Sequence, residues 1–333
     1  MLKASSIALS ASLFLALLGG CQATDPGLEA PIPVATEDSP QVEAVANAFT
    51  FELGSSIGIE GVSPELIALP EGGYLLFVTG LGEDRVYRSD DAITFAPEPS
   101  VRVPMGRDYS LLQKPDGTWL LYYVMMEGAP GEPGEPGEPG EPGAPGEPMD
   151  PATAKKAVMV SASQDLRTFA QGSSTGISQQ TSDRAWGVPD TYIGPDGTYR
   201  MMWVDKAVGQ NWEVLRTASS SDGLSFTADE DFVISDGYVD PFMMRAEEGG
   251  WLLLLSTTPG RLPQKIFVAT SPDGITWDIP KSPLLEASDR NYLDPTAVET
   301  SEGVWQVILS TAPLADALSG PYEYLSGVFT ETP

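Results

Sequence analysis

The sequence predicts an all-β protein in which one structural unit is repeated around a closed ring. Three observations support this prediction. Short apolar segments rich in β-branched and aromatic residues recur along the chain, most of them open with an aromatic residue, and turn sequences such as Pro-Asp-Gly separate them. Such residues favour strands, and such turns favour antiparallel connections. No segment shows the period of an amphipathic helix.

The first twenty residues predict an export signal. Lys3 precedes an apolar run from Ile7 to Leu18 that is too short to span a membrane. The following Leu-Gly-Gly-Cys resembles the lipobox of bacterial lipoproteins, which implies cleavage before Cys21 and lipidation of that residue. We therefore expect a cell-envelope protein with a lipid anchor, in the outer membrane or at the cell surface. An ordinary signal peptide with an incidental cysteine is the alternative.

Residues 21–46 are rich in Pro, Glu, Asp, Ala and Thr and have little apolar surface to bury. Such composition predicts a disordered acidic tether that would hold the folded part away from the membrane.

The folded part, residues 47–333, contains five repeats. Each begins with a short strand, continues with a turn and an aromatic-led apolar strand, and, in all but the last, contains a Ser-x-Asp hairpin. The leading aromatic residues are Tyr74, Trp119, Tyr199, Trp251 and Trp305. Five units of about four strands predict a five-bladed β-propeller. A six-bladed ring and a two-sheet sandwich are the alternatives. Residues 47–54 read as a strand without a blade, and we expect them to complete the last blade and close the ring.

An insertion at residues 127–150 interrupts the second repeat. It contains seven consecutive Gly-x-Pro triplets, from Gly128 to Pro148, and glycine at every third position is typical of collagen. Because both ends of the segment belong to one blade and five of the triplets carry glutamate, we expect a solvated polyproline II loop. We therefore expect the protein to be a monomer. Trimerisation through a collagen-like triple helix is the alternative.

The composition excludes several kinds of chemistry. The chain has no histidine and one cysteine, so no imidazole-dependent triad, intrachain disulfide or zinc site of the usual His/Cys type can form. The formal net charge of −29 argues against a nucleic-acid partner, because the phosphate backbone is bound by basic surfaces. Acid–base chemistry would fall to the carboxylates.

Carboxylates also recur at one position of the repeat. Counting back from the leading aromatic residues aligns Ser63, Asp108, Val188, Asp240 and Asp294 at the start of each innermost strand. Two residues farther along, where side chains point the same way, are Glu65, Ser110, Asp190, Phe242 and Thr296. The sequence thus predicts a ring of five carboxylates, with Arg107 and Arg290 nearby and aromatic walls from Tyr109, Trp186, Tyr192, Tyr238 and Tyr292. Asp before Pro also has an architectural interpretation, as a residue that bonds neighbouring backbone.

Several motifs resemble those of the five-bladed glycoside hydrolases of families 43, 32 and 68, the arabinanase, levansucrase and invertase group. The motifs are Gly106-Arg107-Asp108, Trp186-Gly-Val-Pro-Asp190, Tyr238-Val-Asp-Pro-Phe242 and the Ser-x-Asp hairpins. The resemblance implies that Asp108 is a general base, Asp240 tunes the acid, and Asp294 stands where the family has a glutamate as general acid. Independently of the resemblance, carboxylates beside aromatic rings suit a sugar site, so we expect sugar contacts by Glu65, Arg107, Tyr109, Trp186, Asp190, Tyr238 and Arg290.

Two functions follow from this sequence. The first is a surface glycosidase that acts on a pentose or fructose polymer. The second is a non-catalytic propeller that binds a glycan, a protein or a cation. We expect no cofactor, although the oxygen ligands of an acidic mouth would suit Ca²⁺.

Overall fold

The computed structural model describes residues 48–80, 85–127, 155–180, 185–207, 209–246, 249–314 and 320–332. The signal segment with Cys21, the tether at 21–46 and the Gly-x-Pro triplets lie outside these residues, so the predictions for them are not tested. Among the described residues, no helix is long and apolar enough to cross a membrane.

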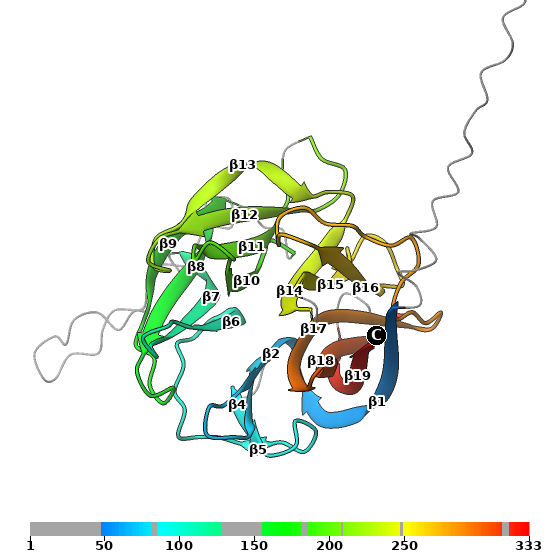
Figure 1. Cartoon of the computed structure of the whole chain (residues 1–333), viewed down its shortest axis with the longest axis horizontal. Coiled ribbons are helices and arrows are strands. Elements are labelled where there is room, and N and C mark those ends of the chain that lie inside the picture. The colour runs from blue at the N-terminus through cyan, green and yellow to red at the C-terminus, as the bar shows by residue number, and fades with distance from the viewer. Residues whose placement is uncertain are drawn as a thin grey trace, which may run out of the picture. The chain divides into compact units, whose positions relative to one another are not determined.

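The described residues form nineteen strands in five antiparallel sheets, which confirms the predicted five-bladed propeller (Figure 1). The first blade contains β2 (Val62–Ala68), β3 (Tyr74–Thr79), β4 (Val86–Ser89) and β5 (Ala96–Pro97). The second contains β6 (Arg107–Gln113), β7 (Trp119–Glu127), β8 (Lys155–Ser163) and β9 (Ser173–Gln180). The third contains β10 (Gly187–Ile193), β11 (Tyr199–Asp205), β12 (Val214–Ser220) and β13 (Thr227–Ile234).

The fourth blade has three strands instead of the expected four: β14 (Tyr238–Arg245), β15 (Trp251–Thr257) and β16 (Ile266–Ser271). The chain beyond β16 makes only isolated bridges to it, at Asp278 and Leu285. Pro280 and Pro283 lie between these bridges. Proline has no N–H to donate, so this segment cannot continue a ladder of hydrogen bonds.

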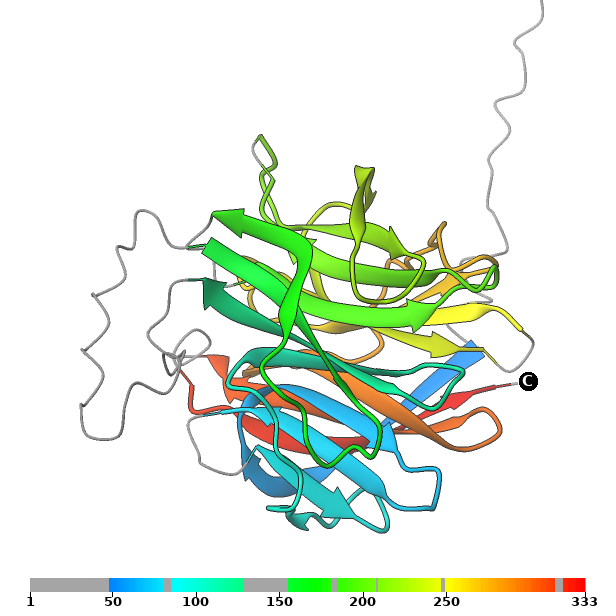
Figure 2. The same ribbon diagram turned by 90° about the vertical axis from the view of Figure 1, so that its left-hand side faces the viewer.

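The fifth blade contains β17 (Arg290–Ser301), β18 (Val304–Pro313), β19 (Glu323–Glu331) and, as its outer strand, β1 (Phe49–Glu60). Strand β1 pairs with β19 from Phe49 opposite Glu331 onward, and the two strands lie side by side in both views (Figures 1 and 2). The rings of Phe49 and Phe329 stack with their centroids 5.4 Å apart. The prediction that the first strand closes the ring is therefore confirmed.

The hydrophobic core lies between neighbouring blades. One cluster, for example, joins Ile67 and Phe77 of the first blade to Leu111, Leu121 and Tyr123 of the second. The five innermost strands, β2, β6, β10, β14 and β17, surround the centre of the ring (Figure 1). Each starts at the same end of the ring, which we call the mouth.

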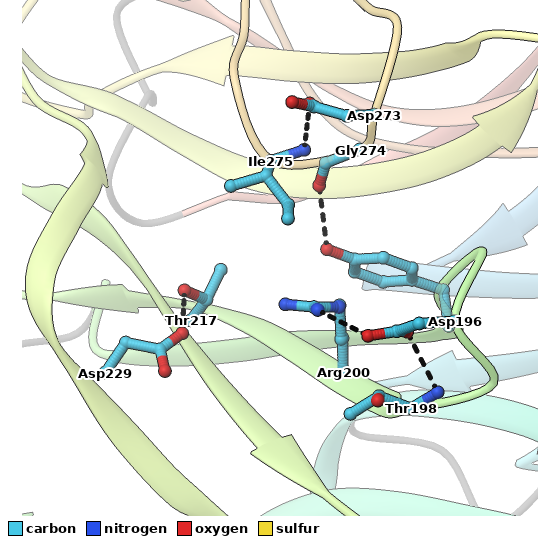
Figure 3. A network of polar contacts seen from close by, with 9 residues as sticks. Asp196, Thr198, Arg200, Thr217, Asp229, Asp273, Gly274 and Ile275 are labelled. Atoms are coloured by element: carbon cyan, nitrogen blue, oxygen red, sulfur yellow. Dashed lines mark hydrogen bonds and ion pairs between the residues drawn. The ribbon is translucent and has the colours of Figure 1, made fainter.

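The Ser-x-Asp hairpins lie at the opposite end, where the third strand of a blade ends. In the fourth blade, Asp273 accepts a hydrogen bond from Ser271 Oγ at 2.9 Å. It accepts another from Ile275 N at 2.8 Å (Figure 3). Asp91, Asp165 and Asp222 make the same serine contact at 2.9–3.1 Å. The motif therefore stabilises a turn in every blade that has it.

Candidate functional site

All five innermost strands begin with the same backbone distortion. One of the first five residues has a positive φ in each case: Ser63 (47°), Asp108 (52°), Val188 (42°), Asp240 (53°) and Asp294 (49°). The pairing with the second strand of the blade shifts register at the same place in all five blades. These are β-bulges, which commonly bend a strand and aim its side chains.

The distortion is a property of the architecture and is not by itself a sign of catalysis. Positive φ is unfavourable for most residues and most so for β-branched ones, and such strain is often found at active sites. Val188, however, is β-branched, carries no reactive group, and has the same φ as its acidic counterparts. The fold therefore imposes this conformation on every blade, whichever side chain is present.

The first side chains at the mouth form hydrogen bonds across four of the five junctions between neighbouring blades. Asp294 Oδ2 accepts a hydrogen bond from Ser63 N at 2.9 Å, and Asp240 Oδ2 accepts one from Asp294 N at 3.3 Å. Asp108 Oδ1 accepts a hydrogen bond from Ser63 Oγ at 2.8 Å, and Asp108 is also bonded by the backbone N–H of Val188. These contacts link the fourth blade to the fifth, the fifth to the first, the first to the second and the second to the third.

A second set of contacts between blades lies two residues farther along the innermost strands. Glu65 Oε1 accepts a hydrogen bond from Leu111 N at 2.8 Å, and Asp190 Oδ2 accepts one from Met243 N at 2.7 Å. Ser110 and Thr296, at the equivalent positions, use their hydroxyls in the same way toward Thr191 N and Leu66 N. Acidic and neutral residues thus fill the same structural role, which is to receive a backbone N–H of the next blade.

Burial raises the pKa of all five carboxyl groups. Glu65, Asp190, Asp240 and Asp294 are only 5–8% exposed, and Asp108 is half-buried. Burial raises the pKa of Asp190 to about 7 and that of Asp240 to about 6. Burial, and then the charge of Asp240, holds the pKa of Asp294 well above its usual value. The carboxyl groups of Asp240 and Asp294 also interact with each other, so the protonation of one depends on the charge of the other.

The space between these side chains is small. The cavity measures about 30 Å³ and is lined by the five acidic residues together with Pro64, Pro189, Pro241 and Pro295. A cavity of this size holds one or two water molecules, whereas pockets for organic ligands are about 300–1,000 Å³. The structure therefore brings the predicted carboxylates together without leaving room for a sugar ring among them.

The other predicted site residues fall into two groups. Tyr109 and Trp186 are buried, and each uses its polar atom within the fold: Tyr109 Oη donates to Pro104 O at 2.9 Å, and Trp186 Nε1 donates to Gln179 Oε1 at 3.1 Å. Arg107, Tyr238 and Arg290 open their strands at the mouth and are exposed or half-buried. Tyr192 and Tyr292, expected as walls, are buried between blades.

The sequence reasoning missed a cluster on the mouth face beside the ring. Trp212, in the connection from β11 to β12, lies under the guanidinium of Arg261, whose Cζ is 4.6 Å from the ring centroid. Arg261 Nη2 forms an ion pair with Asp236 Oδ1 at 2.7 Å, and Asp236 precedes Tyr238 by two residues. These residues are on loops that differ between blades, so the repeat carries no signal for them. Within the described residues, no group of three acidic or cysteine side chains is placed to hold a metal ion.

Comparison with known proteins supports the architecture. No protein-family model and no curated protein matches the chain. Among solved structures, a thermostable family-43 glycoside hydrolase is similar, with a TM-score of 0.57 and 13% identity over 80% of this chain and 89% of that one. An endo-arabinase from Bacteroides thetaiotaomicron has a TM-score of 0.57 and 12% identity, covering 85% and 97% of the two chains. An α-L-arabinofuranosidase from Lactobacillus brevis has a TM-score of 0.58 and 10% identity, covering 82% and 91%. The chain has the fold of these proteins.

Proposed function

We propose that this protein binds a saccharide on the mouth face of the propeller and does not cleave it. The observation that carries the proposal is the use of the mouth carboxylates. Glu65, Asp190, Asp240 and Asp294 each accept a backbone N–H of the neighbouring blade, so they hold the ring together. The fold shared with glycoside hydrolases supports a saccharide as the ligand class.

Hydrolysis needs a different arrangement. A general acid and a base or nucleophile must flank the glycosidic bond at about 5–10 Å from each other, with the sugar between them. Here the cavity that Asp108 and Asp294 line measures about 30 Å³, which holds one or two water molecules. This space is too small for a sugar ring between the base and the acid that the resemblance implies.

The rim of the mouth offers a more suitable surface. Trp212 and Tyr238 supply aromatic faces, and Arg261 and Asp236 supply a donor and an acceptor at the same place. Aromatic rings with a few placed polar groups are a common composition for sites that bind small polar ligands. Because Arg261 is held by both Trp212 and Asp236, the polar groups are positioned before a ligand arrives.

One observation favours hydrolysis as a second candidate. A neutral carboxylic acid is needed as proton donor, and the raised pKa values of Asp240 and Asp294 keep a proton in the mouth up to about pH 6. In this alternative, Asp108 would be the base and Asp294 the acid, and the mouth would have to widen to admit the substrate.

A single set of measurements separates the two candidates. Affinity electrophoresis and reducing-sugar release would be measured with arabinan, xylan and levan for the wild type and for the Trp212→Ala and Asp108→Asn variants. Phe232→Ala, which removes an exposed aromatic residue of the third blade, is the matched control. We expect retarded migration without sugar release, lost in Trp212→Ala and retained in Phe232→Ala. Sugar release that disappears in Asp108→Asn would establish the second candidate, and absence of any binding would refute both.

The envelope location remains part of the proposal. Lipidation at Cys21 would place the propeller at a membrane surface, and the acidic segment 21–46 would serve as its tether. Mass spectrometry of the mature protein tests this, because a Cys21→Ser variant should lose both the lipid mass and the membrane association. An unmodified Cys21 in the membrane fraction would contradict it.

A further inference from the structure

A larger cavity lies away from the mouth, between the first and second blades. It measures about 260 Å³ and is lined by the turn after β2, the turn after β6 and the hairpin between β8 and β9. Since β2 and β6 start at the mouth, these turns lie at the opposite end of the ring. We call this cavity the blade 1–2 groove.

The walls of the groove are fixed by backbone hydrogen bonds. The chain after β5 runs beside the β8–β9 hairpin, where Arg102 N donates to Arg167 O at 2.7 Å and Phe169 N donates to Arg102 O at 2.9 Å. Apolar side chains, including Leu75 and Trp119, form part of its lining. The groove therefore exists before any ligand binds, which lowers the conformational entropy that binding must overcome.

Two arginines line the groove without an ion pair. In the described part of the chain, neither Arg88 nor Arg167 has a carboxylate oxygen within 4.0 Å, and the guanidinium of Arg167 makes a long hydrogen bond of 3.5 Å from Nη1 to Ser100 Oγ. Basic side chains are scarce in this chain, which has 18 Lys and Arg residues against 47 Asp and Glu residues. Two arginines without a direct ion pair at a single cavity therefore call for an explanation.

The repeat shows that the fold does not require these arginines. Arg88 immediately precedes the hairpin serine of its blade, and the equivalent residues are Ala162, Ser219 and Thr270. Arg167 occupies the hairpin position that holds an exposed apolar residue in the other three blades, namely Ile93, Leu224 and Ile275. Both arginines depart from what the other blades use, and both departures meet at this groove.

The charges of the groove indicate the chemical class of its ligand. Arg88 and Arg167 face three carboxylates of the same lining, Glu71, Glu98 and Asp165. Hydrogen bonds from Ser100, together with the charges of the two arginines, lower the pKa of Glu98. Hydrogen bonds from Arg167 N and from Ser163 lower the pKa of Asp165. Both carboxyl groups are therefore ionised at neutral pH. An anionic ligand would meet the carboxylates, and a cationic ligand would meet the guanidiniums. An uncharged polyol can accept hydrogen bonds from the arginines and donate to the carboxylates.

We propose that the blade 1–2 groove binds a neutral sugar unit, as a second saccharide site at the end of the ring opposite the mouth. Gln113 and Gln164 line the same cavity and add amide donors and acceptors, and Trp119 adds an aromatic surface. The volume of about 260 Å³ lies just below the usual range for small-ligand pockets and exceeds the mouth cavity of about 30 Å³ many times. This site does not depend on whether the mouth binds or cleaves a glycan.

The test restores the residues that the other blades use. The double variant Arg88→Thr/Arg167→Leu would be compared with wild type by saturation-transfer NMR with xylotetraose, arabinotetraose and the acidic tetragalacturonate. Arg200→Thr is the matched control, because it removes an arginine at the same end of the third blade, outside the groove. All proteins would carry Trp212→Ala, so that binding at the mouth rim does not contribute.

We expect at least one neutral tetrasaccharide to bind, and its affinity to fall about tenfold or more in the double variant but not in Arg200→Thr, because charge-assisted hydrogen bonds are lost. Tetragalacturonate should bind more weakly than the neutral ligand. If the double variant does not fold, the single Arg167→Leu change carries the same expectation. Absence of neutral-sugar binding, equal affinity in the variant, or preference for tetragalacturonate would each overturn the proposal.

Discussion

The buried carboxyl of Asp190 makes the stability of the propeller depend on pH. Its Oδ2 accepts the N–H of Met243 at 2.7 Å, which links the third blade to the fourth, and burial raises its pKa to about 7. Replacement of Asp190 by asparagine keeps a carbonyl oxygen to receive this N–H and removes the ionisable group. The variant therefore separates the hydrogen bond from the buried charge.

The magnitude follows from the difference in proton affinity between the folded and unfolded states. A carboxyl with a pKa of about 7 when folded and 3.8 when unfolded binds its proton more tightly in the native protein. Its stabilising contribution is complete below pH 3.8 and disappears as the pH rises through 7, a total of about 4 kcal/mol. Roughly 2.5 kcal/mol of this change falls between about pH 5 and pH 8. The amide of the Asp190→Asn variant cannot lose a proton, so the variant escapes this loss.

The charge of Asp190 also contributes to raising the pKa of Glu65, so its removal acts on that neighbour in the same direction. Any cost of burying the amide is independent of pH and shifts the whole curve without changing its slope. The readout is therefore the difference in unfolding free energy between variant and wild type as a function of pH.

Urea unfolding followed by tryptophan fluorescence at pH 5, 6, 7 and 8 measures this difference. We expect Asp190→Asn to gain roughly 2.5 kcal/mol relative to wild type from pH 5 to pH 8. Asp196→Asn is the control, because Asp196 is exposed and hydrogen bonds from Thr198 lower its pKa, so its contribution is constant over this range (Figure 3). Parallel curves for Asp190→Asn and wild type would refute the assignment of a buried, protonated carboxyl.

Two further changes test the ring itself. Val188→Asn should stabilise the protein by about 1 kcal/mol, because asparagine tolerates the positive φ of 42° better than valine. The change also adds a polar side chain at the one apolar position among the five positive-φ residues of the mouth. A lower melting temperature would show that the packing of the valine methyl groups contributes more. Phe329→Ala should destabilise the protein by about 3–5 kcal/mol, since this fully buried ring packs against Phe49 and Trp305 where the propeller closes. Thermal unfolding measures this loss, with Phe232→Ala as a control that should stay within about 0.5 kcal/mol of wild type.

The blade count was readable from the sequence because the repeat is carried by local signals. Turn sequences, the Ser-x-Asp hairpin and the leading aromatic residue each act within a few residues, and each recurs in the structure where it was expected. The closing role of β1 was also predictable, since an unpaired strand at one end and an incomplete blade at the other complement each other. The three-stranded fourth blade was missed, although Pro280 and Pro283 carried the signal.

The site was less predictable because it depends on contacts between blades. Alignment of the repeats found the five mouth positions, yet it could not show that Asp294 bonds to Ser63 N, 231 residues away, or that the cavity between the acids is small. The Trp212–Arg261 contact joins loops of two blades that share no motif. Such contacts arise from the geometry of the closed ring, which no local pattern encodes.

A repeat architecture provides an internal standard for separating structure from function. Where every blade has the same feature, as with the positive φ at the mouth, the feature is required by the fold, and Val188 shows that a carboxylate there is optional. Where one blade departs from the others without a structural reason, the departure indicates a separate role. The mouth acids largely obey the repeat, whereas Arg88 and Arg167 break it at one cavity. Four of the mouth acids thus have a structural role as acceptors of backbone N–H groups from the next blade, and the two arginines mark the groove that we propose as a binding site.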